Sequence, residues 1–206
     1  MRNPVCVIFY REDSCENWQL YGLAEGATTA AKMLIENGMI TKETLAYKGN
    51  GKGKVAIRYV GALPAEERVE FIVQALTHRN GWSFLDLYLD IKNVYDRYDY
   101  EGTMNIMASV YVLHHYEDFY ALVDSAWTAA KMLVEEQYID ENSFVVSDDY
   151  PRAGKYRTVG ELMKAWSKEG QIVDIVSYLL EETSHWSLMS WTLEEQILWT
   201  KEDYGG

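Results

Sequence analysis

Hydrophobic residues in this chain form a strand-then-helix pattern twice, once in each half. Each half opens with a run of β-branched and aromatic residues that is typical of a strand, VCVIFY at 5–10 and SVYVL at 109–113. Apolar residues at helical spacing follow each run, and we predict one helix from each set. The residues are Leu23, Ala27, Ala30 and Leu34 in the first half and Leu122, Ala126, Ala129 and Leu133 in the second.

Short extended segments follow each predicted helix. In the first half, segments 44–47 and 54–60 are separated by the glycine-rich sequence at 48–53. The second half has comparable segments at 143–146 and 155–157. Because glycine-rich stretches between extended segments are typical of tight turns, we interpret both pairs as β-hairpins.

A second helix and a final element complete each half. Pro64 introduces the helix in the first half, and Thr158 with Glu161 forms a capping-box pattern in the second. The final element gives two signals. Residues 85–91 alternate between apolar and polar, which indicates a strand, whereas the sequence TLEE at 192–195 is typical of a capped helix start. We therefore expect a strand that runs into a helix in both halves.

The two halves also share residues in order. Residues 20–45 align without gaps with residues 119–144, and 11 of these 26 positions are identical. The most visible block is TAAKML, at 29–34 and again at 128–133. Several of the shared residues are polar and lie off the apolar stripe, so a common amphipathic pattern does not account for them. Common descent is the simpler explanation.

The sequence thus predicts an α+β protein made by tandem duplication of a ~100-residue unit. Its two repeats are residues 1–99 and 100–206, which we expect to pack as a pseudo-twofold pair, each a mainly antiparallel sheet covered by helices on one face. Charge separates the repeats: the first has 12 Lys and Arg against 13 Asp and Glu, and the second has 7 against 19. The net charge is −1 for the first and −12 for the second, out of −13 in total.

This asymmetry bears on the partners and the compartment. A strongly acidic second repeat argues against direct binding to nucleic acid or to an anionic membrane, and it favours a basic protein surface; solubility alone is the alternative explanation. No apolar run approaches the ~20 residues that cross a bilayer. The only two cysteines, Cys6 and Cys15, give no disulfide framework. We expect a cytoplasmic protein, in the host cytoplasm if it is phage-encoded, and the sequence does not determine its oligomeric state.

No motif for catalysis, a metal or a cofactor emerges. The sequence KGNGKGK at 48–54 fits no phosphate-binding pattern, and we interpret it as a hairpin tip. His114 and His115 are adjacent on a predicted strand, so their side chains should point to opposite faces. Glu182 and His185 have helical i, i+3 spacing, but carboxylate-bridged metal sites need two such motifs. We expect no catalytic residue, no metal and no cofactor.

Aromatic residues beside acids give the strongest signal for binding. The chain has 7 Trp and 16 Tyr, and several of these tyrosines adjoin carboxylates. Tyrosine and tryptophan are enriched in binding hot spots, so we predict a partner-binding surface of tyrosines and paired acids, mostly in the second repeat. Its residues are Tyr98, Tyr100, Glu117, Asp118, Glu135, Glu136, Asp148, Asp149, Tyr150, Glu181 and Glu182.

Three functions are compatible with these features. The first is a non-enzymatic acidic inhibitor of a basic or nucleic-acid-binding partner, such as a phage or mobile-element anti-CRISPR or anti-restriction protein whose carboxylates imitate the phosphates of DNA in a nuclease groove. The second is an immunity protein or antitoxin that neutralises a basic toxin. The third is an enzyme with its site between the two repeats.

Overall fold

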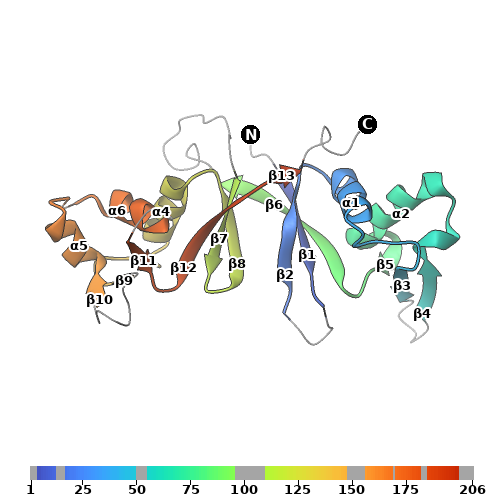
Figure 1. The fold of residues 1–206 in the computed structure, drawn as a ribbon, viewed down its shortest axis with the longest axis horizontal. Coiled ribbons are helices and arrows are strands. Elements are labelled where there is room, and N and C mark those ends of the chain that lie inside the picture. The colour runs from blue at the N-terminus through green and yellow to red at the C-terminus, as the bar shows by residue number, and fades with distance from the viewer. Residues whose placement is uncertain are drawn as a thin grey trace. The chain divides into compact units, whose positions relative to one another are not determined.

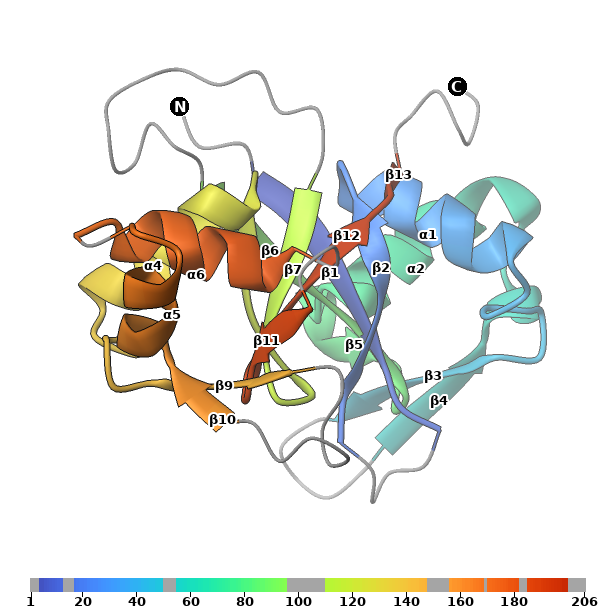
Figure 2. The same cartoon turned by 60° about the vertical axis from the view of Figure 1, so that its left-hand side comes forward.

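The computed structural model describes residues 4–12, 17–49, 55–95, 110–147, 156–168, 170–181 and 185–199 (Figure 1; Figure 2). The chain forms two compact units: residues up to Asn93 together with the segment that begins at Ile197, and residues Val94–Gln196. The described residues contain five α-helices and several strands, so the α+β class is confirmed.

The first unit begins with two strands and a helix, and a small hairpin and a second helix follow. Its elements are β1 (Pro4–Tyr10), β2 (Gln19–Ala24), α1 (Ala27–Glu36), β3 (Leu45–Gly49), β4 (Val55–Tyr59), the 3₁₀ turn η1 (Val60–Ala62), α2 (Ala65–Leu76), the 3₁₀ turn η2 (Arg79–Gly81), β5 (Trp82–Ser83), β6 (Leu87–Tyr95) and, near the end of the described chain, β13 (Leu198–Trp199).

The second unit has a similar order of elements, except that two short helices stand where the first unit has α2. Its elements are β7 (Val110–His115), β8 (Asp118–Val123), α4 (Ala126–Glu135), β9 (Phe144–Ser147), β10 (Tyr156–Thr158), α5 (Val159–Ala165), α6 (Ile172–Leu180), β11 (Trp186–Leu188) and β12 (Trp191–Gln196).

The strands of each unit belong to a larger sheet and to a small antiparallel one. The strand orders are β6-β1-β2-β13 and β4-β3-β5 in the first unit, and β12-β7-β8 and β10-β9-β11 in the second. Most neighbours are antiparallel, but β13 runs parallel to β2, and the last two residues of β6, Val94 and Tyr95, pair in parallel with β8. The larger sheet is therefore mixed, with both parallel and antiparallel pairs.

The predicted hairpins and the capping box are confirmed. Strand β3 pairs with β4, and β9 pairs with β10, both antiparallel. Thr158 is the N-cap of α5: its hydroxyl accepts from the Glu161 amide at 3.2 Å, and the Glu161 carboxylate accepts from the Thr158 amide at 2.9 Å. The four-residue spacing thus satisfies two amides that the first helical turn leaves without partners.

Two predictions about element type are wrong. Leu23 and Leu122 belong to β2 and β8 rather than to the helices, which begin at Ala27 and Ala126. Thr192 does not start a helix, because residues 191–196 pair with β7 over their whole length. Cross-strand pairing with a buried neighbour outweighs a local pattern that resembles a helix cap.

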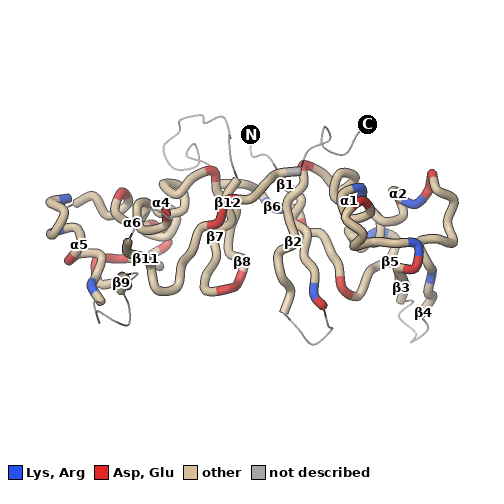
Figure 3. The backbone as a smooth tube through the Cα atoms, in the orientation of Figure 1, with Lys and Arg blue, Asp and Glu red and all other residues tan. Residues whose placement is uncertain are grey.

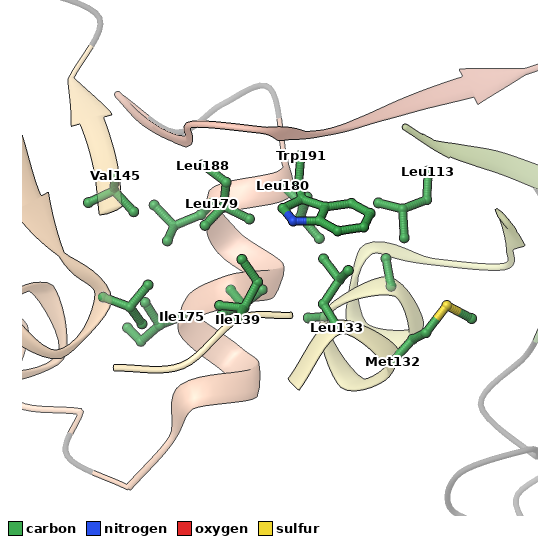
Figure 4. Close-up of a cluster of buried hydrophobic side chains, with 14 of the residues drawn as sticks. Leu113, Met132, Leu133, Ile139, Val145, Ile175, Leu179, Leu180, Leu188 and Trp191 are labelled. Atoms are coloured by element: carbon green, nitrogen blue, oxygen red, sulfur yellow. The ribbon is translucent and has the colours of Figure 1, made fainter. Parts of the chain in front are cut away.

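Each unit has its own hydrophobic core. In the second unit, α4 and α6 pack together with β11 and β12, and the Leu133, Ile175, Leu179 and Trp191 side chains gather between them (Figure 4). In the first unit, α1 and α2 pack together, and Leu34 and Ile72 are fully buried.

The strand register has the same irregularity in both units. The β1–β2 register shifts between Ile8 and Phe9, and the β7–β8 register shifts between Leu113 and His114. Such a shift marks a β-bulge, which bends a strand and re-aims the side chains beyond it. Aligning the two bulges in sequence matches Ile8 of β1 with Leu113 of β7. In the following sections, strand residues that are equivalent in this alignment are called matched positions.

A close backbone approach also occurs in both units. The Gly61 amide donates to the Lys42 carbonyl, and the Gly160 amide donates to the Glu141 carbonyl, both at 2.8 Å. A Cβ at Gly61 would lie 2.8 Å from the Lys42 carbonyl oxygen, and one at Gly160 would lie 3.0 Å from that of Glu141. The lack of a side chain is therefore what permits both hydrogen bonds.

Candidate functional site

The predicted acidic residues of the second unit fall into three places. Glu117 and Asp118 lie at the turn between β7 and β8, Glu135 and Glu136 at the end of α4, and Glu181 at the end of α6; all five are exposed. Figure 3 colours the Asp and Glu positions of the backbone red. The other predicted partner-binding residues lie outside the described part of the chain: Tyr98, Tyr100, Asp148, Asp149, Tyr150 and Glu182.

A pocket of about 630 Å³ lies beside Glu181, between α4, α6 and β12. We call it the acidic pocket. Its volume is within the range of pockets that hold small ligands or single side chains of a partner. Its lining residues are Tyr111, Ser125, Ala126, Trp127, Ser177, Leu180, Glu181, Leu193, Glu194 and Glu195.

Strand alternation decides which carboxylates of β12 point into the acidic pocket. Leu193 packs against the core between the sheet and the helices, and Glu195, two residues on, shares that face. Glu195 is also directly opposite Tyr111 of β7 in the strand register. Glu194 points to the other face, where its carboxylate lies 3.6 Å from His114 Nε2. Two carboxylates, from Glu181 and Glu195, therefore supply the pocket's charge.

The electrostatics of the acidic pocket favour a cation. Among the described residues that line it, none is Lys, Arg or His. Glu181 follows the last turn of α6, where the helix dipole adds partial negative charge. The first turn of α4 has the opposite partial charge, but Ser125 accepts from the Thr128 amide there at 3.2 Å. Because each helix end contributes only about half a charge, the two carboxylates dominate.

His114 and His115 lie on opposite faces of β7, as strand alternation predicts. The His114 Nε2 atom is 3.6 Å from a Glu194 carboxylate oxygen. Burial lowers the pKa of His114, and the charge of Glu194 opposes part of that effect. The His115 ring instead stacks on Trp191, with 4.5 Å between centroids. The two imidazoles therefore belong to different environments and do not form one site.

Aromatic rings and acids meet in a second group, the hairpin cluster, which comprises His115, Tyr120, Glu136, Tyr138 and Trp191. Trp191 is buried and contacts Tyr120 and Tyr138 at 5.0 and 5.4 Å between ring centroids. The Tyr120 hydroxyl donates to the Glu136 carboxylate at 2.5 Å. Burial and this hydrogen bond raise the pKa of Tyr120. Tyr120 is therefore a neutral donor that fixes the Glu136 side chain.

Other predicted acids are arranged differently. Asp118 is opposite His115 in the strand register, so it lies next to the hairpin cluster. Glu135 forms an i, i+4 ion pair with Lys131 at 2.9 Å, which offsets its charge. The second unit thus divides its acids between the acidic pocket, the hairpin cluster and a neutralised helix pair.

At the strand positions that match Tyr111 and Glu195, the first unit carries no acid. There Cys6 of β1 is opposite Ile91 of β6, at the place where Tyr111 is opposite Glu195. Thr28 is the matched residue of Trp127, at a shift of 99. The features that make the acidic pocket electronegative are therefore confined to the second unit.

Metal-ligand clusters and membrane-spanning helices are both absent from the described residues. No group of three or more metal-ligating side chains occurs among them. Within the same residues, no helix is both long and apolar enough to span a bilayer. The glycine-rich loop at 50–54 and the Glu182 of the Glu182–His185 motif lie outside the described residues.

Glu181 is the one described lining residue of the acidic pocket that was among the predicted site residues. Tyr111, Trp127 and Glu195, which supply its rings and its second carboxylate, were not predicted. The signal that could have found Glu195 is the alternation of Trp191, Leu193 and Glu195 along one strand face. The helix-cap interpretation of TLEE concealed it. Tyr111 and Trp127 require the strand register and the helix packing, which no local pattern supplies.

Comparison of the chain with protein-family models, with curated proteins and with solved structures gives no match.

Proposed function

We propose that this chain is a non-enzymatic acidic binding protein that inhibits a basic or nucleic-acid-binding partner, such as an anti-CRISPR or anti-restriction inhibitor of a phage or mobile element. The observation that carries this proposal is the acidic pocket, in which Glu181 and Glu195 adjoin Trp127 and Tyr111 and no described lining residue is cationic. Its natural ligand class is a cationic side chain of another protein.

A guanidinium group fits this chemistry well. Carboxylates accept its N–H donors in charge-assisted hydrogen bonds, and an indole or phenol ring attracts its face. Arginine and lysine side chains that line a nucleic-acid groove make the same kind of contacts with phosphates. A pocket that binds one of them removes a phosphate contact, and an acidic surface around it repels the nucleic acid.

The hairpin cluster supports the same proposal from a different place in the second unit. Tyr138 is about half exposed, at 52%, and Tyr116, which contacts the His115 ring from the turn between β7 and β8, is 66% exposed. Tyrosines that are held by stacked neighbours lose little entropy on binding, which is why they serve as hot spots. Glu136 and Asp118 supply charge at the edge of these rings.

Affinity capture with the full-length tagged chain tests the proposal, in a host that expresses CRISPR and restriction nucleases. We expect the wild-type chain to retain a nucleic-acid-binding protein, and DNA to compete for it. The double variant Glu181→Lys/Glu195→Lys should lose this capture, because it places two cations where the partner's cation binds.

The matched control is Glu36→Lys/Glu70→Lys, which makes the same change in net charge at two exposed helix positions of the first unit. It should capture the partner as the wild type does. If both double variants capture the partner equally well, the acidic pocket is not part of the interface. If both lose capture equally, net charge alone explains the effect.

We also propose that the two units descend from a duplicated ancestor of about 100 residues. The support is structural as well as sequential. A register shift at matched positions, a close glycine approach and the TAAKML block recur in the same order. These details are not required by an α+β class, so independent origin would have to reproduce each one.

A further inference from the structure

The first unit contains an aromatic pocket that the proposed function does not use. It has a volume of about 480 Å³ and lies where the end of β1, the start of β2 and the α2–β5 connection meet. Three aromatic rings, from Trp18, Trp82 and Tyr88, contribute to its walls, and Phe84 is buried beneath them. Pockets of this size with several aromatic walls suit planar ligands.

The rings of the aromatic pocket are held in place by contacts with each other. Trp18 meets Tyr88 edge to face with 4.6 Å between ring centroids, and Tyr88 stacks on Phe9 at 4.9 Å. Trp82 meets Phe71 edge to face at 5.3 Å. Trp18 is still 37% exposed. A preorganised ring that remains accessible can stack on a ligand without a large loss of entropy.

Cationic groups lie beside these rings, and none of the described residues that line the pocket is an acid. The Arg11 guanidinium lies 4.4 Å over the Trp18 ring and donates from Nε and Nη2 to the Leu85 carbonyl at 3.0 and 2.7 Å. His78 also lines the pocket. Lys48 and Arg58 lie over the Trp82 ring, at 5.8 and 5.3 Å from its centroid. The local field therefore favours an anion.

We propose that this aromatic pocket binds a nucleoside monophosphate, with the base stacked on the rings and the phosphate attracted by Arg11 and His78. The walls of the pocket meet two requirements of such a ligand. They offer planar surfaces for a base, and they carry positive charge with no carboxylate among the described lining residues. The proposal concerns a different unit and the opposite charge from the acidic pocket, so it stands independently of the proposed function.

Isothermal titration of the full-length chain with adenosine monophosphate tests it, with adenosine and inorganic phosphate as separate titrants. We expect saturable binding of the monophosphate, at least threefold weaker binding of adenosine, and no saturable binding of phosphate alone. Trp18→Ala should weaken binding about 5- to 100-fold, which corresponds to the loss of one base stack.

The control is Trp166→Ala, which removes a tryptophan of almost equal exposure, 36%, outside this pocket. It should bind as the wild type does. If Trp18→Ala does not fold, His78→Asn replaces it, since Asn tolerates the left-handed backbone at φ 54° and should weaken the monophosphate more than adenosine. Absence of saturable binding to the wild type, unchanged binding in the folded variant, or equal affinity for adenosine would overturn the proposal.

Discussion

The two units use matched strand positions for different purposes. In the first unit Cys6 is opposite Ile91, and in the second Tyr111 is opposite Glu195, beside the same bulge in the neighbouring pair of strands. The fully buried positions, by contrast, keep apolar residues in both units, as Leu34 and Leu133 do. Packing thus restricts the interior, whereas the exposed strand position of Ile91 and Glu195 accepts either a neutral or a charged side chain.

The largest expected effects on stability concern the two hydrophobic cores. Leu34→Ala and Leu133→Ala each remove a fully buried side chain from the matched helices α1 and α4. We expect each variant to lower the free energy of unfolding by about 2–5 kcal/mol, because a cavity adds to the lost burial. Urea unfolding followed by circular dichroism measures both.

Ile35→Ala is the control for this pair, since Ile35 is the next residue in α1 and is 37% exposed. Its cost should be clearly smaller than that of Leu34→Ala. A loss below about 1 kcal/mol in either leucine variant would show that the matched position is not part of a tightly packed core.

Substitutions at the helix caps should change the free energy of unfolding less, and in opposite directions in the two units. Ser125 caps α4 by accepting from the Thr128 amide, whereas Gly26 at the matched place before α1 offers no side-chain cap. Ser125→Ala should cost about 1 kcal/mol in unfolding free energy. Gly26→Ser should stabilise by a few tenths of a kcal/mol, because the backbone there is extended and nothing lies within 4 Å of an added Cβ.

Thermal or urea unfolding of the two variants against the wild type measures both signs. Loss of stability in Gly26→Ser would contradict the equivalence of the two caps. A neutral Ser125→Ala would mean that solvent satisfies the Thr128 amide as well as the hydroxyl does.

The smallest expected effect concerns pH. His114 occupies the place that Phe9 has in the first unit, and burial lowers its pKa. The folded state therefore favours the neutral imidazole. As the pH falls below about 6.5, the unfolded chain takes up this proton more readily, so stability is lost on acidification. His114→Phe should lose less thermal stability between about pH 7.5 and 5.5 than the wild type does.

The other three histidines are present in both proteins, so the difference between the two pH profiles isolates His114. Identical profiles would show that Glu194 compensates fully for the burial of the imidazole.

Local sequence patterns predicted the parts of the fold that local interactions determine. The capping box of Thr158 needs only residues three positions apart, and the β3–β4 hairpin needs only a short connection. Leu23 was assigned to a helix because a strand residue four positions before Ala27 has helical spacing by coincidence. Thr192 was misassigned because its pairing partner, His114, is far away in the sequence.

The candidate site, like the fold, was predictable from the sequence only where it depends on local patterns. Glu181 was recognised because it sits in a run of acids, and run composition is a local property. Glu195 and Tyr111 are separated by more than eighty residues and become neighbours only through the β7–β12 register. Trp127 joins them because α4 packs on that sheet. Non-local pairing therefore decides which acids of the second unit form a pocket.

The pairing of β13 with β2 has a consequence for the order of assembly. Leu198 and Trp199 cover the edge of β2 at Leu23 and Ala24, although the ribosome makes these two segments about 170 residues apart. At roughly 5–20 residues per second, that edge waits on the order of 10 to 30 seconds for its neighbour. An uncovered strand edge is a template for pairing with other chains. During synthesis, the first unit therefore most needs a chaperone in the period before β13 has been made.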